Sequence, residues 1–112
     1  MLFCITAQYT PLAINGMLDD PTTNRAEAIK KLLDAAGGKL VSMYFYPAEG
    51  PGVMVIFDVP DPDMAVAISG VAVSSSAAQN VHLTRLFTMD EVNTIRQKRV
   101  KLSGTYKPPG QG

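Results

Sequence analysis

Apolar and polar positions separate most sharply in the middle of the chain. Residues 53–59 form a short apolar run rich in β-branched side chains, and clusters of Pro, Gly and Asp bound it at 47–52 and 60–63. A run this short, with such boundaries, predicts a strand rather than a buried helix. We therefore expect residues 53–59 to be a central strand around which the other elements are arranged.

Three further segments are expected to be strands, at residues 2–9, 39–46 and 81–87. Alternate side chains of a strand point to opposite faces of its sheet. One set of strand positions is strongly apolar and is expected to meet the helices: Phe3, Ile5, Val41, Met43, Phe45, Val53, Val55 and Phe57. The opposite set is mixed and contains Cys4, Thr6, Gln8, Ser42, Tyr44, Tyr46, Met54, Ile56 and Asp58.

Two main helices follow from capping residues and helical spacing. Asn24 is a favourable N-cap with Glu27 three positions later, and Gly37 and Gly38 follow the helix that they begin. Its apolar stripe is Ile29, Leu32, Leu33 and Ala36. In the second helix Asp61 is the N-cap and Pro62 takes the first position. The buried stripe expected there is Met64, Ile68 and Val71.

Two segments lie outside this pattern of main elements. Residues 10–22 contain Gly, Asp and Pro, which predict an irregular loop with a single helical turn at 12–15. Thr88 and Glu91 have the spacing of a capping box and predict a short C-terminal helix.

The order of elements is β-α-β-β-α-β followed by that C-terminal helix. This order is typical of the ferredoxin-like α+β fold, in which right-handed crossovers place both helices on one face of a four-stranded antiparallel sheet. The mixed face of the sheet is then uncovered. A face with Met54, Ile56 and tyrosines is too apolar to be left in water, so we expect two copies to pack sheet against sheet around a cavity.

Composition bounds the classes of function. With 112 residues there is room for one domain, expected at 1–100, and for a tail rich in Pro and Gly at 101–112. Ten basic and ten acidic residues cancel, which disfavours nucleic acid or an anionic membrane as partners. No apolar run reaches the length of a membrane span, and the N-terminus lacks the features of a signal peptide. The single cysteine, Cys4, favours a cytoplasmic location.

Four groups of residues, in this order and spacing, resemble the GYD-domain family of small bacterial proteins. They are Asn24-Arg25-Ala26-Glu27-Ala28, Gly37-Gly38-Lys39-Leu40 with Tyr44, Val53 to Asp58 leading to Pro60-Asp61, and Phe87-Thr88-Met89-Asp90-Glu91. The resemblance covers residues 3–96. It implies a ferredoxin-like homodimer of the dimeric α/β-barrel type, and it implies little about activity because most members have none assigned.

The chain departs from that family at the signature itself. The Gly-Tyr-Asp of the family falls on Gly50-Pro51-Gly52, so only the glycine is kept. A role of the family's aspartate cannot be transferred to this position. The acidic residue near the end of the strand is kept as Asp58.

Two residues are candidates for acid–base chemistry. His82 is the only histidine, and its unperturbed pKa lies near neutrality, which suits a general acid or base; the alternative is a plain surface residue. Asp58 would have a raised pKa if it faced a cavity, and would otherwise satisfy nearby backbone groups.

The candidate ligand contacts are polar side chains on the strands: Thr6, Gln8, Tyr44, Tyr46 and Arg85. The tyrosines would alternatively pack across a dimer, and Arg85 would alternatively form a surface ion pair. Cys4 is expected to be an inert thiol. No metal-site spacing occurs, and no cofactor is expected.

Two functions from different classes are consistent with this pattern. The first is a small homo-oligomeric protein that binds a small molecule between sheets or acts as an accessory protein. The second is a cofactor-free isomerase or oxygenase in which Asp58 or His82 transfers a proton. Residues 55–60 are locally similar to the muconolactone isomerases, although a shared fold does not determine function. A structural assembly module whose tail docks on a neighbour is a third possibility.

Overall fold

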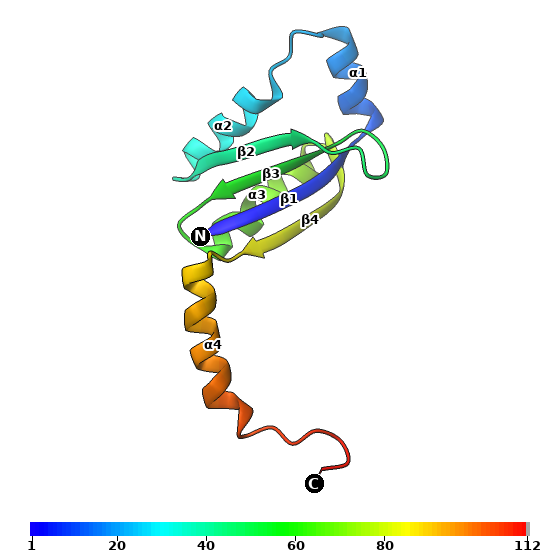
Figure 1. Cartoon of the computed structure of the whole chain (residues 1–112). Helices are drawn as coiled ribbons and strands as arrows, with labels where there is room; N and C mark the ends of the chain where they lie inside the picture. Colours follow the sequence, from blue (N-terminus) through cyan, green and yellow to red (C-terminus); the bar gives the residue numbers. More distant parts are fainter. Residues whose placement is uncertain (112) are drawn as a thin grey trace.

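The computed structural model describes residues 1–111 and contains one four-stranded sheet with helices on one face (Figure 1). The elements in chain order are β1 (Leu2–Tyr9), α1 (Pro11–Asp19), α2 (Arg25–Ala35), β2 (Lys39–Phe45), β3 (Gly52–Asp58), α3 (Pro62–Ser74), β4 (Ala78–Leu86) and α4 (Met89–Ser103). The strands lie in the order β2-β3-β1-β4 and all neighbours are antiparallel. The predicted ferredoxin-like α+β fold is therefore confirmed.

The core lies between the sheet and the helices α2 and α3. Phe57 is fully buried, and Leu33 of α2 and Ala65 of α3 are at most 1% exposed. Phe3 and Phe57 of neighbouring strands stack with ring centroids 5.9 Å apart. Burying a side chain of this size contributes about 1.5–3 kcal/mol. Apolar side chains from one face of the sheet and from the facing sides of α2 and α3 thus form the layer between helices and sheet.

The helix caps predicted for α2 and α3 are confirmed. The Asn24 side chain accepts a hydrogen bond from the Glu27 amide at 3.1 Å, and Asp61 accepts one from the Met64 amide at 2.8 Å. Gly37, after the end of α2, has a φ of 73°, a backbone conformation that favours glycine. No helix within residues 1–111 combines the length and apolar character needed to cross a membrane.

Three residues predicted to be buried are exposed instead: Val41 and Phe45 of β2, and Val71 of α3, which is 49% exposed. The register of β2 against β3 shifts between Leu40 and Ser42, so Val41 lies in a β-bulge and is 53% exposed. Leu40 packs against the core in its place. Phe45 keeps its position opposite Val53 but is 68% exposed, because it lies at the end of β2. A bulge changes the alternation locally, and no simple period-two pattern anticipates it.

The predicted loop at 10–22 is wrong in part, because nine of its residues form the helix α1. The Thr10 hydroxyl accepts a hydrogen bond from the Ala13 amide at 3.2 Å, and Pro11 takes the first helical position. Pro11 therefore ends β1 and also begins a helix, since its missing N–H has no partner at that position in any case. Gly16 within the segment did not prevent helix formation.

The C-terminal helix is longer than the short helix predicted. The capping box of Thr88 and Glu91 is present, but α4 continues for 15 residues and is the longest helix described. It leaves the end of β4 and points away from the sheet (Figure 1). The molecule is consequently elongated, with extents of 63, 32 and 21 Å.

Candidate functional site

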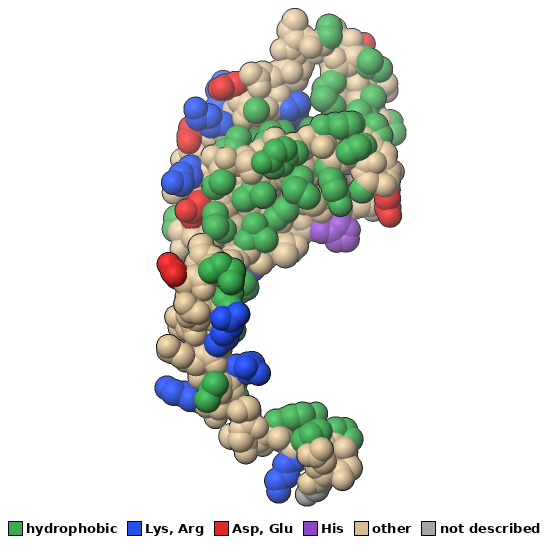
Figure 2. Space-filling view, viewed as in Figure 1, with side chains coloured by type: hydrophobic (Ala, Val, Ile, Leu, Met, Phe, Trp, Pro, Cys, Tyr) green, Lys and Arg blue, Asp and Glu red, His purple; other side chains and the backbone are tan. Residues whose placement is uncertain are grey.

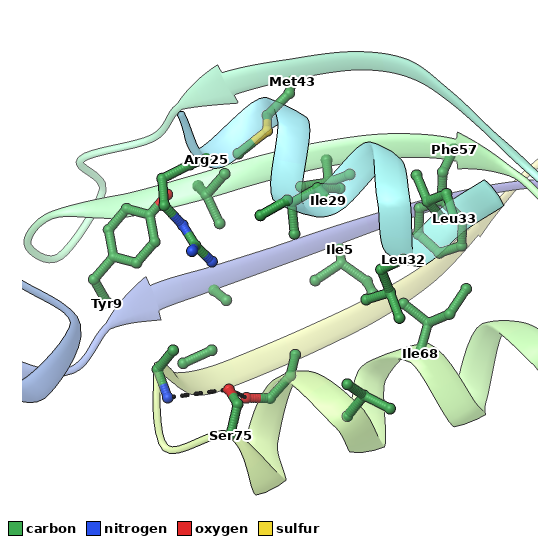
Figure 3. Close-up of a pocket in the computed structure, with 18 residues that line it drawn as sticks. Ile5, Tyr9, Arg25, Ile29, Leu32, Leu33, Met43, Phe57, Ile68 and Ser75 are labelled. Atoms are coloured by element: carbon green, nitrogen blue, oxygen red, sulfur yellow. Dashed lines mark hydrogen bonds between the residues drawn. The ribbon is translucent and has the colours of Figure 1, made fainter. Parts of the chain in front are cut away.

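An apolar pocket of about 200 Å³ lies between the sheet and the helices α2 and α3 (Figure 3). Its walls come from all four strands of the sheet and from the facing sides of both helices. Ile29 and Leu32 of α2 line it on one side, Ile68 of α3 on another, and Ile5 and Val55 form its floor. Most of its surface is apolar because it continues the core into the space between α2 and α3.

One end of the pocket is polar. Tyr9, at the end of β1, and Arg25, in the first turn of α2, lie side by side there, and the Arg25 guanidinium reaches into the pocket (Figure 3). Ser75 lies at the end of α3 and accepts a hydrogen bond from the Ala77 amide at 3.2 Å. A guanidinium donates up to five N–H groups in a planar fork, which suits carboxylate, phenolate or carbonyl oxygens. The pocket therefore has an apolar body and a cationic end.

Sequence reasoning nominated none of these polar residues. A signal was nonetheless present, since Arg25 lies four residues before Ile29 and seven before Leu32, on the apolar stripe of α2. A charged residue on such a stripe either ends the buried surface or points into a pocket. Only the space left between α2 and α3 distinguishes the two cases.

The opposite face of the sheet has no helix on it, and hydrophobic side chains gather there (Figure 2). The register places Cys4 beside Ile56 and Thr6 beside Met54, as the predicted mixed face requires. Tyr44 lies opposite Met54 and is 56% exposed. This surface, with Cys4, Thr6, Tyr44, Met54 and Ile56 near its centre, is called the open face below.

A polar hollow at one end of the open face brings together four of the predicted site residues. Thr6, Gln8, Tyr46 and His82 line it, and two residues that the prediction missed join them, Glu49 and Asn80. Asn80 donates a hydrogen bond to the Gln8 side chain at 2.5 Å. Gln8 in turn donates to the Glu49 carbonyl at 3.0 Å. These bonds link β1, β4 and the turn after β2.

His82 lies opposite Thr6 at the margin of the open face (Figure 2), while Asp58 lies opposite Leu2. Leu2 and Thr6 are four positions apart in β1, which is about 13 Å along a strand. Within one subunit the two residues are therefore too far apart to act on the same atom. Their role in proton transfer stays a prediction.

Asp58 is held ionised by its surroundings. Its carboxylate accepts a hydrogen bond from the Met1 ammonium at 2.8 Å, and this bond lowers the pKa of Asp58. Burial acts against this, and the charges of the N-terminus, Lys39 and Arg85 lower the pKa further. The direction is opposite to the raised pKa expected of a carboxyl group desolvated in a cavity.

Arg85 lies on the helix side of the sheet, because it is opposite Phe3 in the register. Its guanidinium pairs with the Glu91 carboxylate at 2.7 Å and lies 4.4 Å from the centre of the Phe87 ring. A hydrogen bond from the Thr88 amide and the bond from Arg85 together lower the pKa of Glu91. The sheet therefore separates Arg85 from the polar hollow, and the ion-pair alternative describes its contacts.

The remaining candidates for chemistry are the Cys4 thiol and groups of side chains that could hold a metal ion. Cys4 is a half-buried free thiol on the open face, and burial raises its pKa. A raised pKa leaves less of the reactive thiolate at neutral pH. Among the described residues, no group of three or more His, Cys, Asp and Glu side chains is arranged to hold a metal ion.

Comparisons with known proteins agree with the fold. A family model described as the GYD domain matches residues 3–95. A solved structure with a TM-score of 0.55 is 5-chloro-2-hydroxyhydroquinone dehydrochlorinase (TftG) from Burkholderia phenoliruptrix AC1100, in complex with 2,5-dihydroxybenzoquinone. The two proteins share 14% sequence identity over 80% of this chain and 97% of the other, a likeness that extends to the fold alone. No curated protein matches the chain.

Proposed function

This chain belongs to the GYD-domain family, and we propose that it binds a small aromatic molecule in the pocket between its sheet and the helices α2 and α3. The observation that supports this most directly is the apolar pocket with Arg25 at one end. Ligand pockets are typically apolar with a few converging polar groups. The proposed position differs from the one expected from the sequence, which was the space between two sheets.

The size of the pocket favours a single ring. An apolar cavity of about 150 Å³ is enough to hold benzene in another protein. About 200 Å³ therefore suits one six-membered ring with small substituents, and it is below the range of about 300–1,000 Å³ that is typical for larger ligands. Isoleucine, leucine and valine side chains would contact the faces of the ring.

The polar end favours an oxygen-bearing ring. Arg25 would donate hydrogen bonds to an anionic or carbonyl oxygen, and Tyr9 would offer a hydroxyl beside it. The solved structure of similar fold holds 2,5-dihydroxybenzoquinone, which is one ring with four oxygens. That compound is therefore a suitable probe for this chain.

The test is thermal unfolding of the full chain with and without 2,5-dihydroxybenzoquinone. A ligand that binds only the folded form raises its stability by about 2.7 kcal/mol at a hundredfold excess over Kd. We expect Arg25→Met to weaken binding and Ile29→Trp to abolish it by filling the pocket. Lys30→Met is the matched control, because Lys30 is an exposed cation on the same helix.

Three results would contradict the proposal. One is the absence of any stabilisation by the probe. Another is equal stabilisation of the wild type and the Ile29→Trp variant, which would place the probe elsewhere. The third is an equal loss in Arg25→Met and Lys30→Met, which would indicate a nonspecific attraction of the probe to positive charge.

The open face supports a second part of the proposal, that two copies associate sheet to sheet. Met54 and Ile56 are half-buried in the single subunit, and Tyr44 and Tyr46 are exposed. A contiguous apolar surface of this kind typically marks an interface. A cytoplasmic location, expected from the single cysteine, stays a prediction.

A further inference from the structure

The helix α4 is almost free of contact with the rest of the chain. None of its residues is buried, and it projects from the end of the sheet into solvent (Figure 1). Ile95 is 42% exposed, and Val100 and Leu102 are more than 60% exposed. Isolated helices of this length are marginal in water, because packing supplies most helical stability. A segment with these properties is stabilised when another surface covers it.

The first turn of α4 is fixed to the body. The Thr88 hydroxyl accepts from the Glu91 amide, and the Glu91 carboxylate accepts from the Thr88 amide, at 3.2 and 3.0 Å. The same carboxylate pairs with Arg85 of β4. These contacts set the direction in which the helix leaves the sheet. Since that direction points outward, the distal part of α4 cannot reach its own body without breaking the helix.

The charges of the chain are divided between the body and this distal segment. Residues 1–95 carry five basic and ten acidic side chains, whereas residues 96–112 carry five basic and no acidic side chains. The neutral total therefore hides a body of net −5 and a C-terminal segment of net +5. We call residues 96–111 the basic arm. Blue side chains along this part of the molecule show the segregation (Figure 2).

We propose that the basic arm docks on the acidic body of a second copy of this chain. The net charge of the arm is equal in size and opposite in sign to that of the body, so the arm of one copy and the body of another attract each other. Ile95, Val100, Leu102 and Tyr106 would be covered in the contact. This goes beyond the proposed sheet-to-sheet association, since it adds a salt-sensitive contact that the open face does not provide.

Cross-linking of mixed isotopes tests the proposal on the full chain. Unlabelled and ¹⁵N-labelled protein are unfolded together, refolded and treated with a carbodiimide, which joins lysine amines to carboxylates in contact. We expect mass spectrometry to find mixed-isotope peptides that join Lys98, Lys101 or Lys107 to carboxylates of residues 1–95. These cross-links should decrease in high salt, because screening weakens exposed charge pairs.

A charge-reversed variant provides a second measurement. Lys98→Glu with Lys101→Glu should weaken self-association at low salt by about tenfold, measured by sedimentation, since complementary charges otherwise attract across the contact. Lys30→Glu with Lys31→Glu is the control, because it changes the net charge equally on the exposed side of α2. The control should leave the arm cross-links in place.

Two outcomes would overturn the proposal, and a third would support it as a separate interface. Cross-links from the arm only within one isotope would mean that the arm docks on its own body. Absence of arm-to-body cross-links, combined with protection of the arm lysines by duplex DNA or phosphatidylserine vesicles, would assign the arm to that other partner. Persistence of the arm cross-links in an Ile56→Lys variant that has lost the sheet contact would instead separate the two interfaces and retain this one.

Discussion

At the scale of single residues, the contacts of the charged side chains depend on which side of the sheet each one lies. Asp58 and Arg85 both lie near the ends of strands, Asp58 in β3 and Arg85 in β4. In the structure Asp58 pairs with the Met1 ammonium and Arg85 with Glu91. The pKa values of the Asp58 and Glu91 carboxylates are both lowered. Both therefore act as structural anions in the single subunit.

The lowered pKa of Asp58 predicts how its contribution to stability varies with pH. Because its folded-state pKa is below the unfolded value of about 3.9, the contribution is present above pH ~4 and is lost as the pH falls through the folded-state pKa. Asp58→Asn should therefore lower the Tm at pH 6 and lower it by less at pH 2. Circular dichroism melts at both pH values measure this. An equal loss at both would show that the Asp58 charge is not the cause.

At the scale of elements, a close approach of the backbone determines where β2 begins, and a capping box determines where α4 begins. A methyl group on Gly38 would overlap the Asp58 carbonyl and lie 2.8 Å from the Val59 side chain. Glycine at this position lets β2 start directly beside the end of β3. After β4, the capping box of Thr88 and Glu91 begins α4, and the ion pair of Glu91 with Arg85 sets the direction of the helix.

Gly38→Ala should consequently destabilise the whole domain. The added methyl would meet backbone and a buried valine, so β2 must move and the cost should reach about 1–3 kcal/mol. Gly16→Ala is the matched control, since a methyl there has open space and an alanine favours the helix α1 by about 0.5–1 kcal/mol. Urea unfolding measures both. A stable Gly38→Ala variant would contradict the close approach.

Thr88→Ala should affect α4 and leave the core unchanged. Loss of an N-cap costs about 0.5–2 kcal/mol of helix stability. Since α4 makes few contacts with the body, this loss should appear as faster amide exchange over residues 89–95, with no change in the protection of β1 and β3. Ser103→Ala, at the other end of α4, serves as the control. Faster exchange of the β1 or β3 amides in the Thr88→Ala variant would contradict this independence of the core from α4.

At the scale of the whole molecule, the uncovered side of the sheet is an apolar surface that the single subunit leaves exposed to solvent. The helices bury only one side, and the open face carries Met54 and Ile56 at its centre. If two copies pack there, a charge at that centre has to be desolvated without a partner, which is strongly unfavourable.

Ile56→Lys should therefore convert the proposed dimer into a monomer. Val66→Lys is the control, because Val66 is an exposed apolar residue on α3 and lies away from the open face. Light scattering at micromolar concentration measures the mass of each variant. A wild-type chain that is monomeric under these conditions would contradict sheet-to-sheet association, and so would an Ile56→Lys variant that remains dimeric.

Local sequence determined the order and class of the elements. The alternation in residues 53–59, the stripe of α2 and the capping residues Asn24, Asp61 and Thr88 each depend on neighbours within a few positions. Such signals do not depend on tertiary contacts, so they predicted the ferredoxin-like sheet with helices on one side. They also placed Thr6, Gln8 and Tyr46 on a common face.

Only the tertiary structure decided which of these residues share a site. The bulge at Val41, the position of Arg85 behind the sheet and the pocket beside Arg25 depend on register and on the gap between α2 and α3. Those are properties of how distant segments pack, and no short window of residues contains them. The direction of α4 is of the same kind, because it depends on a side chain from β4 meeting the first turn of the helix.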